Sequence, residues 1–229
     1  MNDYPSLLSD EIITRAEKLS PALLCDGMKS FKLPYDGAME AGIMPVSSSM
    51  KVIGTACTVN TDSGDNLPIH VALYTAKPGY VMVIDGKGHK DNPYFGDLMM
   101  STGKAVGLKG MIIDGYVRDK EGAKELGLPI FAKGFMQRGP ENDNPGEVNY
   151  PIVCGGVKVK PGDLIVGDAD GVTVVPSEII EEVLTNAEKK LVYEIQRREE
   201  IARYEEHRIN GKELFNLAPQ WVTDLLSEL

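Results

Sequence analysis

The chain has 229 residues, of which 42% are hydrophobic and 25% charged, a composition typical of a globular protein with a large core. Its formal net charge of -10 argues against a nucleic-acid surface, because such surfaces depend on clustered lysines and arginines. The three cysteines are far apart, the N-terminus lacks the pattern of a signal peptide, and no segment reaches the ~20 apolar residues of a membrane span. We therefore expect a soluble, cytoplasmic protein that binds neither nucleic acid nor membranes.

The first part of the chain predicts two short helices followed by a loop. Apolar residues spaced between charges favour a helix over residues 8–18. Ser20 and Pro21 favour a second helix over residues 22–29, because serine is a preferred N-cap and proline a preferred first helical residue. Residues 33–49 are rich in Pro, Gly and Ser without a period, and they predict a surface loop.

The middle of the chain alternates between strand and helix patterns. Strands are predicted at 51–59, 80–86, 108–114 and 130–135, and helices at 68–76, 98–106 and 120–126. The second and third strands both end in Asp-Gly, at Asp85 and Asp114, with the spacing of a parallel β-α-β unit. Loops at the carboxyl ends of such strands commonly carry the ligand site. We therefore expect residues 86–94 and 115–119 to form neighbouring loops.

The last part predicts a flap, small strands and one long helix. Residues 136–150 have no core pattern and predict a long ordered loop. Tight turns separate short strands predicted at 157–159, 164–166 and 172–175, which suggests a β-meander. With Ser177 as its N-cap, a helix is predicted to run to about Arg208. Its apolar stripe thins beyond Ile195, which is typical of a helix that packs on another subunit.

Two short segments of the β-α-β unit could form a binding cleft. Gly96 and Asp97 open the helix predicted at 98–106, while Arg118 and Asp119 follow the next strand. Taken alone, Asp97 is explained as a helix cap worth about 0.3–1 kcal/mol, and Arg118-Asp119 as a surface ion pair. Taken together, they suit an anionic substrate that chelates a metal, because helix amides bind carboxylates and Mg²⁺ needs only one or two protein carboxylates.

The candidate carboxylate-binding amides belong to Gly96, Asp97, Leu98 and Met99. A zinc site is not expected, since the three histidines share no metal-type spacing.

At these residues the chain resembles the family of RraA-like proteins and 4-hydroxy-4-methyl-2-oxoglutarate aldolases, which also act as oxaloacetate decarboxylases. The resemblance extends from Leu19 to about Arg208 and includes segments 54–59, 96–98, 113–119, 126–132 and 161–172. The aldolase branch is marked by an Asp, twenty intervening residues and Arg-Asp. Asp97, Arg118 and Asp119 match that pattern.

The resemblance implies an α/β fold of the swivelling β/β/α type: one domain over residues 1–229 with a mixed central sheet or barrel, flanking helices and a long C-terminal helix. It implies a homotrimer or hexamer in which residues 177–229 make subunit contacts. It also implies a divalent metal, Mg²⁺ or else Mn²⁺, held by Asp119 largely through waters. Glu199 or Glu200 of a neighbouring subunit would join the site.

For the remaining site residues the resemblance implies distinct roles. Arg118 would bind the pyruvyl oxygens, and the amides around Leu98 and Met99 would hold the carboxylate. Asp97 would organise a water ligand of the metal or take part in proton transfer. One departure concerns Gly122, where many members carry an acidic residue; Glu121 or Glu125 could substitute for it. The roles of Arg138 and Glu147, in the flap, are left open.

The expected function is metal-dependent cleavage of 4-hydroxy-4-methyl-2-oxoglutarate-like 2-oxo acids to pyruvate, and decarboxylation of oxaloacetate, through a metal-stabilised pyruvate enolate. Two alternatives compete with it. An aldolase of the other type would form a Schiff base, with Lys133 as the candidate lysine. A non-catalytic RraA-like protein would instead bind and regulate an RNA-degrading enzyme.

Overall fold

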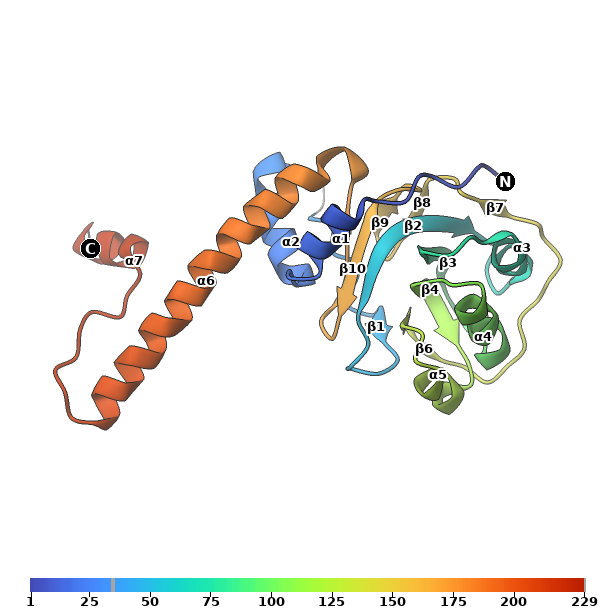
Figure 1. The fold of residues 1–229 in the computed structure, drawn as a ribbon. Helices are drawn as coiled ribbons and strands as arrows, with labels where there is room; N and C mark the ends of the chain where they lie inside the picture. Colours follow the sequence, from blue (N-terminus) through green and yellow to red (C-terminus); the bar gives the residue numbers. More distant parts are fainter. Residues whose placement is uncertain (34–35, 229) are drawn as a thin grey trace. The chain divides into compact units, whose positions relative to one another are not determined.

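The computed structural model describes residues 1–33 and 36–228 (Figure 1). The chain divides into two compact units, residues 1–187 and 188–229, and each is described by itself. Residues 34 and 35 of the predicted loop at 33–49 lie outside the described residues. The rest of that loop is interrupted by strand β1 (Met44–Pro45), which sequence analysis missed because two residues carry no periodic pattern.

The first unit is built on a mixed, nearly closed sheet (Figure 1). Its strand order is β1-β5-β4-β3-β2-β10-β11, and the edge strands β1 and β11 lie near each other. The parallel centre consists of β2 (Val52–Asn60), β3 (Tyr80–Pro93), β4 (Gly110–Val117) and β5 (Ile130–Ala132). Antiparallel strands flank it: β1, β10 (Leu164–Asp168) and β11 (Gly171–Val175). The predicted α/β class with a mixed sheet is confirmed.

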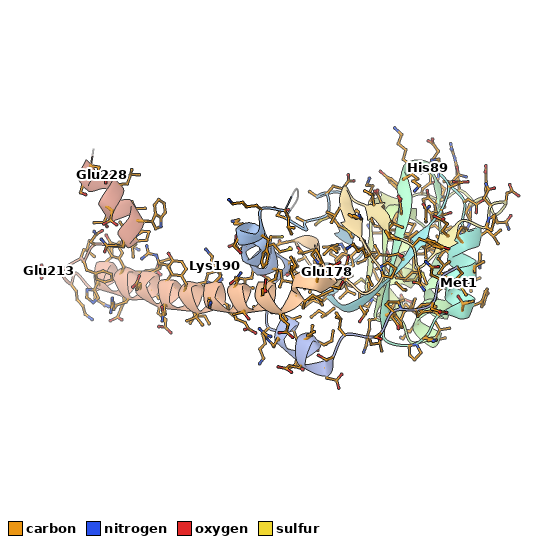
Figure 2. All side chains as sticks on the ribbon, turned by 90° about the horizontal axis from the view of Figure 1, so that it is seen from above. Met1, His89, Glu178, Lys190, Glu213 and Glu228 are labelled. Carbon is orange, nitrogen blue, oxygen red and sulfur yellow. The ribbon has the colours of Figure 1, made fainter. Side chains whose placement is uncertain are left out.

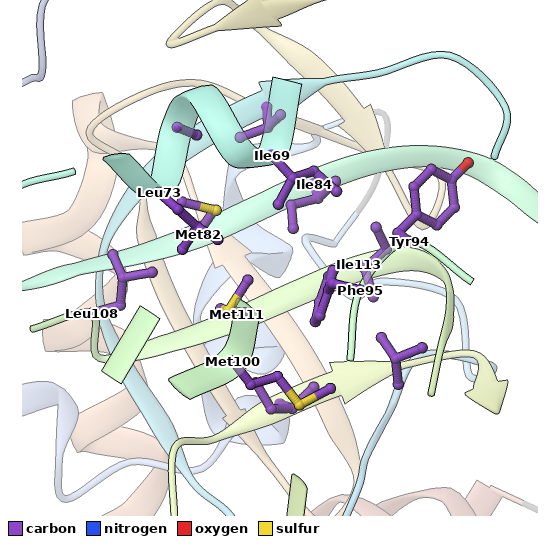
Figure 3. Close-up of a cluster of buried hydrophobic side chains, with 14 of the residues drawn as sticks. Ile69, Leu73, Met82, Ile84, Tyr94, Phe95, Met100, Leu108, Met111 and Ile113 are labelled. Carbon is purple, nitrogen blue, oxygen red and sulfur yellow. The ribbon is translucent and has the colours of Figure 1, made fainter. Parts of the chain in front are cut away.

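Alternating side chains of the parallel strands supply two separate cores. Met82 and Ile84 of β3 face one core, whereas Val81 and Val83 face the other, as the two-residue period of a strand requires. The first core is covered by three helices, α3 (Leu67–Thr75), α4 (Asp97–Ala105) and α5 (Lys120–Leu126) (Figure 3). The β-α-β units therefore place the starts of α4 and α5 at the carboxyl end of the sheet.

Strands β3 and β4 are longer than their sequence patterns predict, so the prediction of loops at 86–94 and 115–119 is wrong. β3 continues to Pro93 through two register shifts, and β4 continues to Val117. The added length has partners that lie elsewhere in the chain, since Tyr116 and Val117 pair with β6 (Gly134–Phe135). Only the turn at residues 118–119 connects β4 to α5.

The predicted β-meander is also wrong. β9 (Val157–Val159) pairs with β8 (Ile152–Cys154) as a separate hairpin, whereas β10 and β11 belong to the large sheet. Gly155 and Gly156 form the hairpin turn with φ of 55° and 77°, values that glycine adopts without steric cost. In the predicted flap at 136–150, β7 (Glu147–Val148) pairs with β2.

Of the two N-caps predicted from the sequence, Ser20 is confirmed and Ser177 is wrong. α1 (Asp10–Ala16) precedes α2 (Pro21–Met28), where the Ser20 side chain accepts a hydrogen bond from Leu23 N, and a 3₁₀ turn, η1 (Lys29–Phe31), follows. Ser177, the predicted N-cap, instead lies in a 3₁₀ turn, η2 (Ser177–Ile179). Its N–H donates to Asp163 Oδ1 at 2.9 Å, and α6 (Ile180–Ile209) begins after that turn.

The second unit contains α6 beyond residue 187 and α7 (Gln220–Glu228). Phe215 stacks edge-on against Tyr204 and His207, which ties the connecting segment to α6. Side chains project around α6 beyond Lys190 (Figure 2). Within residues 1–33 and 36–228, the structure has no helix with both the length and the apolar character needed to cross a membrane.

Candidate functional site

The start of α4 and the turn after β4 lie against each other. Arg118 N donates a hydrogen bond to Phe95 O at 3.0 Å, and Asp97 N donates to Asp119 Oδ2 at 3.2 Å. Arg118 Nε lies 3.5 Å from the same Asp119 oxygen. Gly96-Asp97 and Arg118-Asp119, which the sequence predicted to form one cleft, are therefore neighbours in the fold, because β3 and β4 are adjacent parallel strands.

Gly96 leaves the space that the Asp119 carboxylate fills. A Cβ atom at position 96 would lie 2.0 Å from Asp119 Oδ2 and 2.9 Å from Arg118 Cγ. No neighbouring atom can be tolerated at 2.0 Å, so any side chain at position 96 must displace the carboxylate or the start of α4.

We expect Gly96→Ala to lower turnover by about tenfold or more, because about 1 Å of misplacement can cost 10²-fold in rate. The thermal unfolding midpoint should change little, since both displaced side chains are about 40% exposed. Steady-state kinetics with oxaloacetate and thermal unfolding measure the two effects. Gly139→Ala is the matched control, because its Cβ would meet no atom within 4 Å. Equal kinetics for the two variants would contradict the assigned role of Gly96.

Asp119 has an unusual backbone conformation. Its φ of 60° and ψ of 52° lie in the left-handed region, which non-glycine residues other than Asn and Asp rarely adopt. Although Asp119 is the N-cap of α5, its side chain makes no capping hydrogen bond and reaches toward α4 instead. Such strained residues concentrate at functional sites.

Two amides at the start of α4 are open to a ligand. Asp97 N–H is used by Asp119, and Met100 N donates to Gly96 O at 3.1 Å. Within the described part of the chain, the N–H groups of Leu98 and Met99 have no acceptor. Because the helix dipole adds positive potential there, these two amides suit a carboxylate. Of the four predicted amides, that of Asp97 is therefore occupied, and this pair in the first turn of α4 is available.

A cavity of about 200 Å³ lies beside Arg118 and Asp119. The other residues that line it are Lys120, Phe135, Met136 and Gln137. Sequence analysis missed these four. Phe135, Met136 and Gln137 reach the site because Val117 pairs with Phe135, whereas Lys120 directly follows Asp119 and belongs to no motif. The only sequence signal was that residues 136 and 137 begin the predicted flap. A small acid fits this volume, which lies below the ≈ 300–1,000 Å³ typical of pockets that bind drug-sized ligands.

Hydrogen bonds hold the flap at 136–146 close to Arg118. Arg138 O accepts from Arg118 Nη1 at 3.5 Å, and the Arg138 guanidinium donates to Asp91 O at 3.2 Å. Asn92 Nδ2 donates to Gly139 O at 2.7 Å. The contact of Arg138 with Arg118 is therefore made by the backbone carbonyl of Arg138 and not by its side chain. Glu147 lies in β7 and accepts from Asn60 Nδ2 at 2.9 Å.

Asp65 anchors this flap at residues 143 and 144. Its buried carboxylate accepts from Leu67 N at 2.8 Å, Asp143 N at 2.8 Å and Asn144 N at 2.9 Å. Burial by itself would raise the pKa of Asp65, but the three N–H donors outweigh burial and hold that pKa below its usual range. The ionised carboxylate is therefore the form that joins the flap to α3.

We expect Asp65→Asn to destabilise the protein by about 1–3 kcal/mol, because the amide NH₂ cannot accept from Asp143 and Asn144 N–H. Because the pKa is lowered on folding, the Asp65 contribution is complete above an unfolded pKa of about 3.9 and is lost as pH falls through the folded value. Denaturant unfolding at pH 7 and at lower pH measures this difference, and amide exchange at residues 143–144 reports the flap. The exposed Asp62→Asn serves as control. If both amides stay protected in Asp65→Asn, the anchoring role is wrong.

Lys133 and Asp114 belong to a different cluster. The Lys133 ammonium pairs with Asp114 Oδ1 at 2.5 Å and with Glu40, while Asp114 Oδ2 accepts from Gly155 N at 2.9 Å. Burial lowers the pKa of Lys133, but its two carboxylate partners outweigh burial and raise it. A Schiff-base lysine needs a lowered pKa, so this environment argues against that alternative. Asp114 lies within β4, and its side chain is turned to the β8-β9 hairpin and not to the turn that holds Arg118.

Gly122 lies directly beside Asp97. A Cβ atom at position 122 would be 3.0 Å from Asp97 Cβ and 3.4 Å from Asp97 Oδ2. An acidic residue at this position would meet Asp97, and glycine leaves that space open. Glu121, a suggested substitute, pairs with Lys124 at 3.1 Å on the exposed side of α5.

The donor set of the cleft suits a hard cation bound largely through waters. Within the described residues, no three His, Cys, Asp or Glu side chains converge as a metal-binding group. Asp119 lines the cleft, and Mg²⁺ commonly takes only one or two carboxylates from a protein before waters and substrate complete its shell. The residues present therefore fit Mg²⁺ and do not fit a structural zinc site.

Glu199 and Glu200 lie on α6 in the second unit, where Glu200 pairs with Arg197 at 2.8 Å. Their contribution to a neighbouring subunit's site stays a prediction.

Comparisons with known proteins point to one family. A family model described as RraA-like, Aldolase/RraA, matches residues 21–174. A protein of Halalkalibacterium halodurans, provisionally named a 4-hydroxy-4-methyl-2-oxoglutarate aldolase, is 45% identical over 148 residues, which are 65% of this chain and 70% of that protein.

Solved structures agree with this assignment. A protein from Pseudomonas syringae pv. tomato has a TM-score of 0.74 and 26% identity, covering 87% of this chain and 96% of the other. Streptomyces coelicolor RraAS2, described as an unusual member of the RNase ES inhibitor RraA protein family, has a TM-score of 0.72 and 26% identity, covering 83% and 98%. The chain belongs to the RraA-like family.

Proposed function

We propose that this protein is a divalent-metal-dependent lyase that cleaves 4-hydroxy-4-methyl-2-oxoglutarate-like 2-oxo acids to pyruvate and decarboxylates oxaloacetate. The observation that carries the proposal is that the Asp119 carboxylate and the Arg118 guanidinium line one small cleft, while Asp119 also accepts a hydrogen bond from the start of α4, where the amides of Leu98 and Met99 are open. The resemblance to provisionally named aldolases at up to 45% identity supports the same chemistry.

Each group has a role that follows from its chemistry. The amides of Leu98 and Met99 bind the carboxylate of the 2-oxo acid. Arg118 provides two or more parallel N–H donors for the oxygens on which negative charge develops. Asp97, at the first turn of α4, is the carboxylate placed to move a proton during the reaction.

The two reactions share one bond-breaking step. In the aldol cleavage, the C3–C4 bond breaks, the 4-hydroxyl loses its proton to a base, and the bonding electrons move into the enolate of pyruvate. In the decarboxylation, the same C3–C4 bond breaks and carbon dioxide leaves with no proton removed. In both reactions C3 then takes a proton to give pyruvate. Asp97 is proposed as the base for the first reaction and as part of the proton path to C3.

The proposed metal is Mg²⁺, with Mn²⁺ as the second candidate, held at Asp119 largely through waters. When bound, it would act as a Lewis acid that polarises the 2-oxo group and offsets the developing negative charge. We further propose a cytoplasmic homotrimer or hexamer in which Glu199 or Glu200 of a neighbouring subunit completes the site.

The direct test is an activity panel with Mg²⁺ or Mn²⁺ over oxaloacetate and several 4-hydroxy-2-oxo acids, with and without EDTA. Pyruvate formation that EDTA abolishes, and that added Mg²⁺ restores, is the expected result. Borohydride treatment in the presence of pyruvate should leave Lys133 unmodified. A covalent pyruvyl adduct at Lys133, with turnover that survives EDTA, would refute the metal-dependent proposal.

The second candidate is a regulator of an RNA-degrading enzyme. Its support is the structural similarity to Streptomyces coelicolor RraAS2, whose family is described by inhibition of RNase ES. The two candidates differ in one measurable way. A regulator should lower RNA cleavage by RNase ES at stoichiometric amounts, whether or not Asp119 is intact, whereas the proposed lyase should leave RNA cleavage unchanged.

A further inference from the structure

The cleft contains a second cation that the proposed chemistry does not use. Lys120 lines the cavity beside Arg118 and Asp119. Its ammonium nitrogen lies 5.2 Å from the centre of the Phe135 ring, a cation–π distance. Because the ring belongs to β6 and the lysine to α5, the contact holds the ammonium of this exposed residue at the cavity wall.

The position of Lys120 is unfavourable for a lysine by local rules. Lys120 is the first residue of α5, and the positive end of a helix dipole disfavours a cation there. No carboxylate of the described chain pairs with Lys120, whereas Lys124, one turn later, pairs with Glu121 at 3.1 Å. The cationic head at the cavity therefore has its charge available for a ligand.

We propose that Lys120 binds the distal carboxylate of the substrate and so makes the enzyme selective for dicarboxylic 2-oxo acids. This inference rests on the proposed function and deepens it. Arg118 and the α4 amides take the 2-oxo carboxylate end, and Lys120 takes the other end of the same molecule. Phe135 and Met136 line the cavity with apolar surface suited to the carbon chain, and Gln137 offers an amide that can bond a hydroxyl.

Selectivity follows because only a dicarboxylate gains a charge-assisted contact with the Lys120 ammonium, whereas a monocarboxylic analogue leaves that ammonium to solvent. The ammonium is also held in place before binding, so less side-chain freedom is lost when the carboxylate arrives.

The test compares Lys120→Met with the unmodified enzyme on two matched substrates, 4-hydroxy-2-oxoglutarate and 4-hydroxy-2-oxopentanoate, which differ in the distal carboxylate. Methionine keeps an apolar stem against Phe135 and removes the charge. We expect kcat/KM for the dicarboxylate to fall about 10- to 100-fold, mainly through KM, with little change for the monocarboxylate. Lys124→Met, on the same helix and already paired, should behave as the unmodified enzyme. Lys120→Arg should restore part of the preference.

A binding measurement separates this inference from the proposed function. Calorimetry in the presence of Mg²⁺ compares 2-oxoglutarate with 2-oxobutyrate, and Lys120→Met should lose the preference for 2-oxoglutarate. If the preference persists in Lys120→Met, or if the unmodified protein has none, the Lys120 inference is wrong even when turnover is present. If the preference depends on Lys120 but no substrate is turned over, the lyase proposal fails and the dicarboxylate site stands.

Discussion

Asp119→Asn is expected to reduce Mg²⁺-dependent decarboxylation of oxaloacetate by about 10³-fold, because a metal supplies several kcal/mol of charge stabilisation. The substitution is nearly isosteric, and asparagine tolerates the left-handed backbone of this position, with its φ of 60°. Its side-chain oxygen can still accept from Asp97 N, which donates to Asp119 Oδ2 at 3.2 Å. The expected loss therefore comes from the missing charge and not from a displaced helix.

Two further measurements and two further variants test this expectation. Calorimetric titration with Mg²⁺ should show weaker binding for Asp119→Asn, while its thermal unfolding should match that of the unmodified protein. Glu121→Gln, on the exposed side of the same helix, controls for a general loss of negative charge. Asp119→Ala should be at least as inactive, and it adds strain because alanine tolerates the left-handed region poorly. Decarboxylation that is unchanged after subtraction of the rate caused by free Mg²⁺ would overturn the site assignment.

Arg118→Lys is expected to lower kcat by about 10²–10³-fold, the loss seen when one donor to a developing oxyanion is removed. Lysine keeps the charge, but it lacks the planar fork that can bind two substrate oxygens at once. In the structure, Arg118 Nε lies 3.5 Å from Asp119 Oδ2, and Nη1 donates to Arg138 O at 3.5 Å, so the guanidinium is oriented before substrate arrives. The loss should therefore appear in kcat more than in KM.

The matched comparison for Arg118→Lys is Arg138→Gln. Arg138 meets Arg118 through its backbone carbonyl, which the substitution retains, and it loses only the bond from its side chain to Asp91 O. We expect a change of a few-fold, mainly in KM. If Arg138→Gln is as damaging to kcat as Arg118→Lys, Arg138 rather than Arg118 carries the anionic end of the substrate.

The main elements of the fold could be predicted because their signals are local. The parallel strands β2, β3 and β4 carry buried β-branched and apolar runs, α4 carries an amphipathic pattern, and α3 is bounded by Pro68 at its start and Pro78 beyond its end. Prediction failed where a strand depends on a distant partner. The outer halves of β3 and β4 are strands because β6 and the bulged pairing with each other complete their hydrogen bonds. Residues 152–159 form a separate hairpin for the same reason.

The candidate site shows the same division. Asp97, Arg118 and Asp119 could be paired from the sequence, because a β-α-β unit places the start of its helix and the end of its second strand at one edge. Lys120 and Phe135 could not, since their contact depends on β6 adding to β4. The orientation of Asp114 could not be predicted either, because its position within β4, and not its proximity in sequence to Arg118, decides which face the side chain takes.

The sequence by itself therefore determined the α/β class, the family and the Asp97, Arg118 and Asp119 set. Only the tertiary structure decided that the Asp119 carboxylate rests on Gly96, that Asp65 anchors the flap, and that Lys120 faces the cleft. The physical reason is range: helix and strand periods and turn residues act within a few positions of the chain. Strand register and the packing of one carboxylate against a distant backbone depend on contacts that exist only once the chain has closed upon itself.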